Sequence, residues 1–451
     1  GEGEGAGEGE GAGEGEGAGE GEVEGAGAGG TAISVCPEGP AVEPPPWFDP
    51  NSVRREALAF CDQGAPNEDV TNLPVSVILT PDIFDFTSAL PDGSDIFFVD
   101  GRTNQVLPFE KAQYLPDDPN GAFAAFFVRV PAFNPHQQAD AIWMYWDNAS
   151  PTHTPNAAST FAGYAQVWHM DGAPPDGDFV GNNTNIVDTV TGATVVNALA
   201  SSFSDNDQQK AFVFGTEGPL GNALVFDAGG VGCNPCFADS FVILPPPPGV
   251  TSTQGSLTLV VGSISETDPN NASNTKTGVG GSGCADGSTD CGHLWLLGEA
   301  QGSLGFDDKS MHASVFGGGR IGVSRPSSPS TAGSFAASSA AAVIDQQNFS
   351  VVSTSWTSAS IDTTVTTVSA DGQTVVQSTI TSARAAVSFP IANFTLAVAE
   401  NNGTFGTAAD LFGLIEEVRV SSTAFDAAYL RAEAASHLDE LFIFGPEETG
   451  P

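Results

Sequence analysis

The sequence predicts an all-β protein with a small β-sandwich domain at residues 47–165 and a larger sandwich at residues 166–445. Glycine and proline are frequent, with 54 and 31 positions among 451 residues, which is typical of short strands joined by tight turns. Apolar stretches are short and are separated by turn signals such as Pro91-Asp92-Gly93. Helical spacing of apolar residues is found only near the C-terminus.

Residues 1–46 are expected to be a disordered acidic tether that ends in a proline-rich linker. The first thirty residues hold nine glutamates and no basic residue, in repeats of Gly-Glu-Gly-Glu-Gly-Ala. Such a segment has almost nothing apolar to bury, and its like charges repel. The chain begins inside a repeat without Met or a signal peptide. We therefore expect either a fragment or a chain whose targeting segment has been removed.

The first domain is expected to contain five short strands. They lie at residues 73–79, 96–99, 106–110, 124–130 and 141–146. Five strands within about a hundred residues, with turns at short intervals, indicate a β-sandwich.

The strand pattern restarts at residue 166 and continues to residue 420. The expected strands are 166–170, 223–226, 240–244, 256–261, 293–297, 303–306, 313–316, 320–323, 349–356, 363–369, 374–379, 394–398 and 414–420. Asp371-Gly372 is a hairpin signal between two of them. Residues 426–441 then place apolar side chains at helical spacing and predict one short helix that covers the sandwich edge.

The formal net charge of −42 excludes some classes of partner. The chain carries 13 basic and 55 acidic residues. Nucleic-acid binding needs clustered lysine and arginine, so nucleic acid is not an expected partner, and anionic lipid is disfavoured for the same reason. No apolar run approaches the length of a membrane span. Cations, in a diffuse atmosphere or as specific Ca²⁺, are the natural small partners.

The six cysteines form three sequence-local pairs and are candidates for disulfides in a secreted chain. They are Cys36, Cys61, Cys233, Cys236, Cys284 and Cys291. Two alternatives stay open for some of them. The last four could hold zinc, although the six-residue gap in the last pair is wide for that metal. The Cys-x-x-Cys spacing at 233–236 suits redox chemistry, but it follows a glycine-rich loop rather than preceding a helix.

One series of motifs in the first domain is shared with a known bacterial domain. It comprises Trp47-Phe-Asp-Pro-Asn-Ser-Val-Arg-Arg55, Leu73-Pro-Val-Ser-Val77, Pro91-Asp-Gly-Ser-Asp-Ile-Phe-Phe-Val-Asp100, Phe127-Val-Arg-Val-Pro131 and Ile142-Trp-Met-Tyr-Trp-Asp-Asn148. Over roughly 100 residues this series resembles an uncharacterised bacterial domain that commonly precedes laminin-G modules in secreted and envelope proteins. Val53, Phe97 and Trp146-Asp147-Asn148 depart from that family's pattern.

A second series of motifs marks both ends of the larger domain. It comprises Val167-Trp-His-Met-Asp171, Gly221-Asn-Ala-Leu-Val-Phe-Asp227, Phe412-Gly-Leu-Ile-Glu-Glu-Val-Arg-Val-Ser421 and Ala424-Phe-Asp-Ala-Ala-Tyr-Leu430. The series is similar to a concanavalin A-like, laminin-G-type jelly roll with a short helix at its end. Glu416 stands where that family usually has Asp, and the long loop at 264–292 departs from it.

The two resemblances imply an extracellular or cell-surface bacterial protein that binds glycan or protein at loop rims, sometimes with Ca²⁺. We therefore expect a secreted or cell-surface adhesion or carbohydrate-binding protein that recognises extracellular glycan or matrix and is not an enzyme. The alternative is a structural surface or scaffold protein without a small ligand. A glycoside hydrolase is a further alternative, because concanavalin A-like folds include such enzymes.

A hydrolase of this fold needs acidic residues at positions i, i+2 and i+4 of one strand, where all of them face the cleft. Glu266-Thr267-Asp268 offers two acids, but no third follows. Glu416 and Glu417 are adjacent and are expected to face opposite sides of their strand. The sequence therefore does not predict a catalytic carboxylate pair.

Candidate ligand residues are few. Asp171, Asp176 and Asp178 lie in one acidic, glycine-rich loop and could supply oxygen ligands to Ca²⁺, although the preferred interpretation is a solvated acidic loop. Trp356 lies among Ser and Thr residues and is the candidate for an exposed ring that stacks on a sugar, with core packing as the alternative. His169, beside Trp168 on an apolar strand, is expected to be a histidine at the edge of the core.

Overall fold

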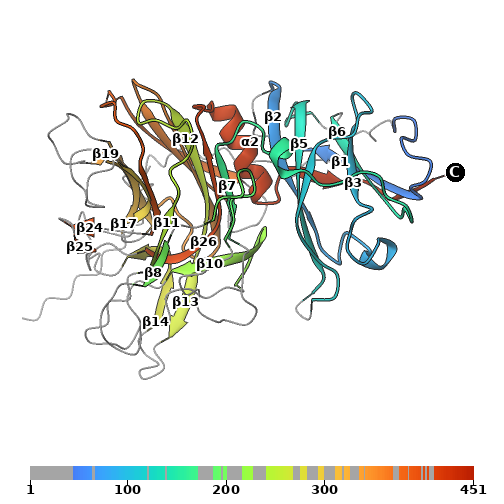
Figure 1. Ribbon diagram of the computed structural model, residues 1–451, viewed down its shortest axis with the longest axis horizontal. Coiled ribbons are helices and arrows are strands. Elements are labelled where there is room, and N and C mark those ends of the chain that lie inside the picture. The colour runs from blue at the N-terminus through green and yellow to red at the C-terminus, as the bar shows by residue number, and fades with distance from the viewer. Residues whose placement is uncertain are drawn as a thin grey trace, which may run out of the picture.

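The computed structural model describes most of the chain after residue 43. The described residues are 44–62, 65, 67–118, 121–137, 140–170, 186–194, 197–200, 216–226, 240–267, 275–281, 293–298, 310–316, 319–325, 335–339, 341–368, 375–383, 385–397, 400–401, 404–405 and 411–450. The fold is all-β, with two β-sandwiches and a short helix between them (Figure 1). This confirms the fold class that the sequence predicts. The acidic tail lies outside the described residues, and the domain boundaries stay a prediction.

The first sandwich is built from two antiparallel sheets. The first sheet has the order β27-β1-β6-β3, with β28 also paired to β1, and the second has the order β2-β5-β4. The strand bounds are β1 Arg54–Phe60, β2 Val70–Leu79, β3 Phe97–Asp100, β4 Phe109–Leu115, β5 Phe123–Phe133, β6 Ala141–Trp146, β27 Phe442–Phe444 and β28 Glu448–Thr449. Phe98 and Phe126 lie between the two sheets with their ring centroids 5.6 Å apart. Two short helical turns, η1 (Phe86–Ser88) and α1 (Ala157–Thr160), connect strands.

The second sandwich is the jelly roll, and its two sheets have nine and seven strands. The larger sheet has the order β22-β21-β20-β12-β26-β10-β9, with β7 and β15 also paired to β26. The other has the order β19-β18-β17-β16-β23-β11-β8. The strands of the larger sheet are β7 Gln166–His169, β9 Thr216–Gly218, β10 Gly221–Phe226, β12 Gly255–Gly262, β15 Gly280–Gly281, β20 Phe349–Trp356, β21 Ile361–Val368, β22 Val375–Ser382 and β26 Leu411–Ser421.

The seven-stranded sheet is assembled from shorter strands. They are β8 Asn197–Ala200, β11 Ser240–Leu244, β16 His293–Gly298, β17 Ser310–Phe316, β18 Arg320–Ser324, β19 Phe335–Ser338 and β23 Asn393–Leu396. The hairpins β13 (Ile264–Thr267) with β14 (Thr275–Gly278) and β24 (Glu400–Asn401) with β25 (Thr404–Phe405) stand apart from both sheets. Alternate residues of the strands, such as Leu257 and Leu259 of β12, enter the core between the sheets.

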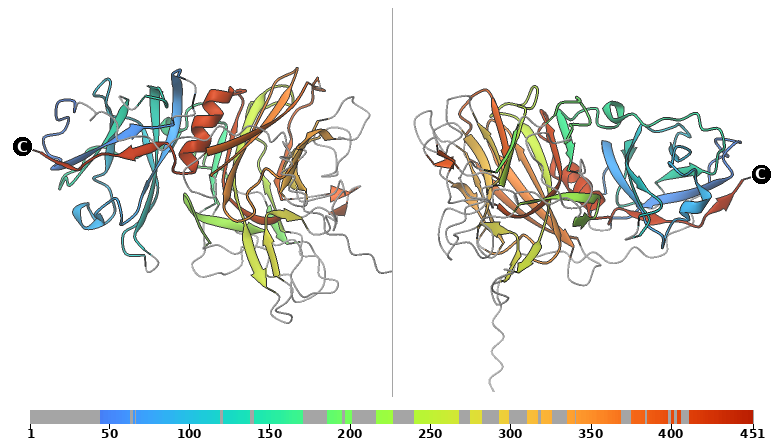
Figure 2. Two further views of the ribbon diagram at one scale, coloured as in Figure 1. Left: turned by 180° about the vertical axis from the view of Figure 1, so that it is seen from behind. Right: turned by 60° about the horizontal axis from the view of Figure 1, so that its bottom comes forward.

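Helix α2 (Ala427–His437) lies between the sandwiches rather than on an outer edge (Figure 2). Asp426 caps its N-terminus by accepting a hydrogen bond from the backbone of Tyr429 at 2.9 Å. The apolar side chains of Leu430 and Ala434 belong to the core cluster that also holds the first sandwich. The helix therefore packs between the two domains and contacts both of them.

The turn after α2 has a backbone conformation that glycine favours. Asp439 has a φ of 59°, and the amide of Glu440 donates to the carbonyl of Ala435 at 2.9 Å, as in a Schellman C-cap. Asp439→Gly is therefore expected to raise the free energy of unfolding by about 0.5–1 kcal/mol. Urea denaturation followed by tryptophan fluorescence measures the change. Asp439→Ala is the matched control and is expected to be destabilising, because alanine tolerates a positive φ poorly.

The C-terminal segment returns from α2 to the first sandwich, which the sequence does not predict. We call residues 441–450 the C-terminal strap. Its strands β27 and β28 pair with β1 in antiparallel register, with Phe60 opposite Phe442 and Arg55 opposite Glu448. Backbone bonds join Cys61 to Leu441 at 2.9 Å and Ala57 to Gly445 at 2.8 Å. The first domain is thus completed by the end of the chain.

Candidate functional site

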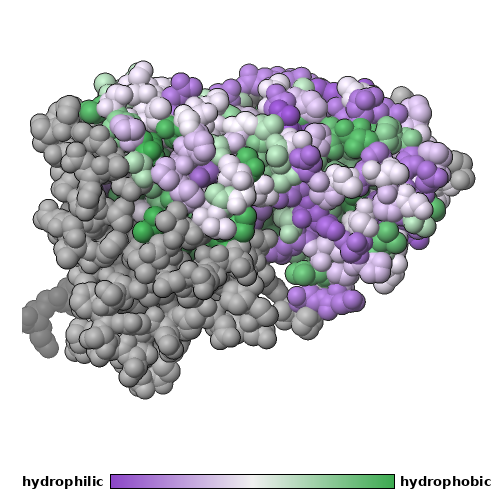
Figure 3. All heavy atoms as spheres, in the orientation of Figure 1, coloured by the Kyte–Doolittle hydropathy of each residue, from purple (hydrophilic) through white to green (hydrophobic). Residues whose placement is uncertain are grey.

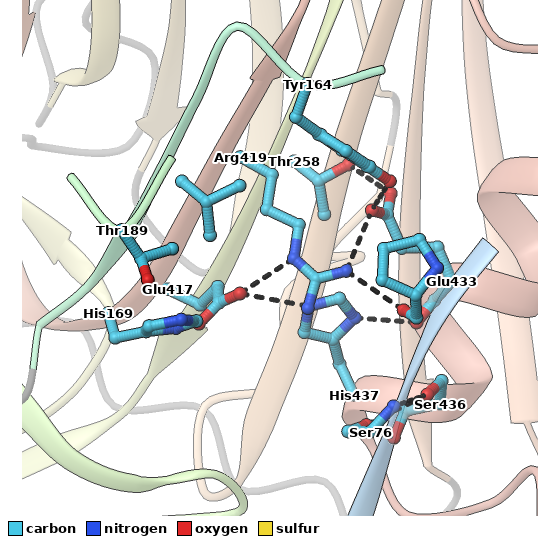
Figure 4. A network of polar contacts seen from close by, with 12 residues as sticks. Ser76, Tyr164, His169, Thr189, Thr258, Glu417, Arg419, Glu433, Ser436 and His437 are labelled. Carbon is cyan, nitrogen blue, oxygen red and sulfur yellow. Dashed lines mark hydrogen bonds and ion pairs between the residues drawn. The ribbon is translucent and has the colours of Figure 1, made fainter. Parts of the chain in front are cut away.

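The densest group of buried charges lies where the two sandwiches and α2 meet. We call it the junction cluster, and its charged members are His169, Glu417, Arg419 and Glu433 (Figure 4). Strand β26 supplies Glu417 and Arg419, which are two residues apart and so share one face. His169 of β7 is the register partner of Glu417. Helix α2 supplies Glu433 from the opposite side.

The guanidinium group of Arg419 connects β26 with α2 and with the first sandwich, and its side chain is fully buried. Its Nε donates to Oε1 of Glu417 at 2.7 Å, and its Nη1 lies 3.3 Å from Oε1 of Glu433. Nη1 also donates to the backbone carbonyl of Pro74 in β2, at 3.2 Å. The guanidinium lies over the ring of Phe127 in β5, 4.8 Å from its centroid. Pro74 and Phe127 belong to the first sandwich, so this side chain joins the two domains.

His169 is held between two carboxylates. Its Nδ1 lies 2.5 Å from Oε2 of Glu417, and its Nε2 lies 3.2 Å from Oε2 of Glu110 in β4. Burial lowers the pKa of His169, but the two carboxylates outweigh that effect and hold the pKa well above its usual value. Burial acts in the opposite direction on Glu417 and raises its pKa. The charges of His169 and Arg419 outweigh burial and hold that pKa well below its usual range. The pair is therefore ionic at neutral pH and links β4 of the first sandwich to the jelly roll.

Glu433 receives hydroxyl hydrogen bonds besides its contact with Arg419. Tyr164 donates to Oε1 at 2.5 Å, and Thr258 of β12 donates to Oε2 at 2.7 Å. Burial, followed by the charge of Glu433, raises the pKa of Tyr164 well above its usual value, so the phenol stays a donor. A second link nearby joins β2 to α2, where Ser76 Oγ donates to the carbonyl of Ser436 at 2.5 Å. A buried carboxylate with several donors keeps its charge at a lower cost.

Glu416 and Glu417 line the same small cavity, together with His169, which corrects the expectation that they face opposite sides of the strand. The register of β26 against β12 shifts between Val260, opposite Glu417, and Val261, opposite Ile415. Glu416 is the extra residue of this β-bulge, and a bulge turns adjacent side chains toward one side. Oε1 of Glu416 accepts a hydrogen bond from the amide of Leu220 at 2.6 Å. Burial raises the pKa of Glu416 well above its usual value, which favours the neutral form of this carboxyl.

The cavity thus places the carboxyl of Glu416 beside the paired side chains of His169 and Glu417. Its volume is about 10 Å³, the space of one water molecule, and seven residues of the described chain line it. A sugar ring does not fit there. Both oxygens of Glu417 are already paired, with His169 and with Arg419. The arrangement therefore joins β26 and α2 to the first sandwich through paired charges and hydrogen bonds.

The structure tests only part of the calcium and cysteine predictions. Asp171, Asp176 and Asp178 lie outside the described residues. Cys61 is disulfide-bonded, and Cys36, Cys233, Cys236, Cys284 and Cys291 lie outside the described part. Within the described residues, no group of three or more His, Cys, Asp or Glu side chains is arranged to hold a metal ion.

Trp356 is not an exposed stacking ring: its side chain is fully buried in the core of the jelly roll. Its ring stacks near Trp295, with centroids 6.2 Å apart, and its Nε1 donates to the carbonyl of Thr251 at 2.8 Å. The neighbouring strand makes room for it at Gly255, where a Cβ atom would lie only 2.5 Å from the indole. The Ser and Thr residues next to Trp356 in the sequence suggested an exposed strand and gave no sign of this packing.

Trp356→Phe is expected to lower the free energy of unfolding by about 1–2 kcal/mol, because it removes a buried hydrogen bond. The carbonyl of Thr251 then keeps only the longer bond from the amide of Gln254, at 3.4 Å. Thermal unfolding measures the change. The matched control is Trp295→Phe, because Trp295 is buried in the same core and its Nε1 has no hydrogen-bond partner among the described residues. A Trp356 variant with unchanged stability would contradict the buried position.

Sequence reasoning placed His169 at the edge of the core but missed its partners. A signal was present, because Glu417 and Arg419 stand at i and i+2 in an otherwise apolar strand. Opposite charges on one face of a buried strand must find partners. Their partner elements, β7 and α2, cannot be paired with β26 from spacing alone.

Comparison with known proteins gives one family match and several distant structural neighbours. A family model described as a domain of unknown function (DUF2341) matches residues 92–171. No curated protein matches the chain in sequence. No helix in the described part of the chain is long and apolar enough to cross a membrane.

Three of the similar solved structures are the following. The CBM40 domain of the Ruminococcus gnavus IT-sialidase, bound to alpha2,3 sialyllactose, is 14% identical with a TM-score of 0.28, and the match covers 41% of this chain and 84% of that one. The leech intramolecular trans-sialidase is 16% identical with a TM-score of 0.27, covering 41% of this chain and 24% of that one. Domains LG4-5 of the mouse laminin alpha1 chain are 10% identical with a TM-score of 0.24, covering 87% and 95%. The chain is thus similar over residues 92–171 to the DUF2341 family.

Proposed function

We propose that the chain is a non-catalytic, secreted or cell-surface protein whose jelly roll recognises extracellular glycan or matrix. In this proposal the first sandwich, of the type that precedes laminin-G modules, is a rigid base for the jelly roll. The observation that carries the proposal is the junction cluster. Its charged groups are paired with one another. They also contact Glu110, Pro74 and Phe127 of the first sandwich, and the cavity has room for one water molecule. Paired groups of this kind stabilise a fixed domain arrangement.

Two further observations support this reading. Cys61 is disulfide-bonded, which favours an oxidising compartment such as the outside of the cell. Hydrophilic and hydrophobic residues are interspersed on the described surface in Figure 3. Four large apolar side chains are exposed among the described residues: Val53, Ile83, Leu115 and Val187. Isolated residues of this kind are ordinary on surfaces in contact with water.

A glycan array with the purified chain, in Ca²⁺ and in EDTA, tests the proposal. Binding that EDTA abolishes would support a Ca²⁺-dependent site and direct mutagenesis to Asp171, Asp176 and Asp178. Binding that persists in EDTA would support a Ca²⁺-independent glycan site. No binding in either condition would count against the glycan ligand. Turnover of a glycan by the chain would contradict the non-catalytic proposal.

A structural scaffold without a small ligand is the second candidate, and the C-terminal strap favours it. The strap joins the end of the chain to the first sheet, so that the two sandwiches form one closed unit. A scaffold should remain inactive on the array yet assemble with itself or with other surface proteins.

A further inference from the structure

We propose that the outer edge of β1 is a strand-acceptor surface, and that it accepts the C-terminal strap of a second copy of this chain in a reciprocal dimer. The proposal concerns self-association and does not rest on glycan binding.

The strap follows the whole length of the β1 edge. Leu58, Ala59 and Phe60 pair with Phe444, Ile443 and Phe442, and Arg54 and Arg55 pair with Thr449 and Glu448. Strand β6 occupies the other side of β1. The strap is therefore the element that keeps this side of β1 from being a free edge, and a free edge is a template for an incoming strand.

The surface is complementary to the strap in both apolar packing and charge. At one end Phe442 packs on Phe60 with ring centroids 5.0 Å apart. At the other end Glu447 lies 2.5 Å from Arg54, and Glu448 lies 2.7 Å from Arg55. The chain has only 13 basic residues against 55 acidic ones, so two adjacent arginines on a strand edge select an acidic strap.

Arg55 is held in place independently of the strap. Its guanidinium lies 4.5 Å from the ring centroid of Trp47 and 4.4 Å from that of Trp143. It also lies 3.1 Å from the hydroxyl of Tyr145. The acceptor charge is thus preorganised by the first sandwich, and it remains available to any strand with the same pattern of aromatic and acidic residues.

The strap is attached in a way that permits exchange. Phe442, Ile443 and Phe444 are half-buried, whereas Leu58 and Phe60 beneath them are buried. The strap follows α2 after a turn of only residues 438–441, in which Asp439 has a positive φ. A strap from a second copy makes the same contacts with β1 as the chain's own strap. The free energies of the monomer and the strap-exchanged dimer therefore differ only through the conformation of this turn and the effective concentration of the attached strap.

Charge reversal on one side at a time tests the proposal. One variant carries Glu447→Lys and Glu448→Lys on the strap, and the other carries Arg54→Glu and Arg55→Glu on the acceptor. Each variant alone has like charges between its own strap and its own β1 edge. In a mixture, each strap finds an edge of opposite charge on the other variant.

We expect co-refolded mixtures of the two variants to contain about ten times more dimer than either variant alone. A tenfold change in the dimerisation constant corresponds to about 1.4 kcal/mol. Size-exclusion chromatography with light scattering measures the dimer, and isotopic labelling of one variant shows that each dimer holds both. The control is a chain with all four reversals, which restores complementary charges both within one copy and between two copies and should therefore show the same share of dimer as the parent chain. If that control folds and the mixture still contains no excess of heterodimer, the proposal is wrong.

Discussion

Arg419→Met is expected to lower the free energy of unfolding by about 3–5 kcal/mol. The substitution keeps a long side chain in the space between Phe127 and α2 but removes the charge that faces Glu417 and Glu433. Two carboxylates would then remain buried with weaker compensation. The carbonyl of Pro74 would also lose its donor. Chemical denaturation followed by fluorescence measures the loss.

Two matched variants separate the charge effect from lost packing. Arg129→Met removes a partly buried arginine of β5 that donates to Asn72 at 3.0 Å, and it should change stability little. Arg419→Met combined with Glu433→Gln removes one of the stranded charges and should recover part of the loss. An Arg419→Met variant that loses less than about 1 kcal/mol would show that the cluster does not hold the domains together.

The protein is expected to be most stable at mildly acidic pH and to lose stability as the pH rises toward 8. Burial, followed by the charge of Glu447, raises the pKa of Glu56 to about 8. Burial, followed by the charge of Asp439, raises the pKa of Glu440 to about 7. In the unfolded chain both groups titrate near pH 4.5, so between these values the folded state binds more protons. Stability therefore falls with rising pH across this window, and Glu56 alone accounts for roughly 3 kcal/mol.

His169 and Glu417 set the limits of this profile. The raised pKa of His169 means that its contribution is fully present below its unfolded pKa and is lost as the pH rises through the folded value. The lowered pKa of Glu417 means that its contribution is lost only as the pH falls through a low value. Both groups thus leave the maximum at mildly acidic pH.

Glu56→Gln isolates the largest contribution to the pH dependence. The variant should be more stable than the parent at pH 9 and should have a flatter profile between pH 5 and pH 8. Urea denaturation at several pH values provides the measurement, with Glu68→Gln as the control, because Glu68 is exposed. An unchanged slope in the Glu56 variant would mean that this carboxyl does not titrate in the expected window.

The sequence predicts the elements of this fold better than their partners. The strand expected at 141–146 is found with those bounds as β6, and the helix expected at 426–441 is found at Ala427–His437. Alternating apolar residues and turn signals are local, so they identify strands directly. Trp356 shows the limit of this reasoning, because its burial depends on Gly255 in a strand a hundred residues away.

The candidate site escaped prediction for a physical reason. Period two places adjacent residues on opposite faces, and this rule holds for β26 except at the bulge that brings Glu416 beside Glu417. A bulge depends on the register between two strands, which one strand's sequence does not specify. His169 joins the cluster only because β7 pairs with β26, a contact that spans 248 residues. Glu433 joins it because α2 folds back toward Arg419, 14 residues away, and that docking depends on the packing of α2 rather than on spacing.

The return of the strap to β1 also constrains the order in which the protein can be made. The first sandwich emerges early during synthesis, yet one strand position of its sheet stays vacant until residues 441–450 have been translated. Domain-by-domain folding from the N-terminus, the usual course for multidomain chains, therefore cannot reach completion here. A ribosome that stalls in the jelly roll would release a product whose β1 edge is still open to other strands. Synthesis through the strap thus becomes a condition for the native pairing of β1, and neither sandwich reaches its final state without the other.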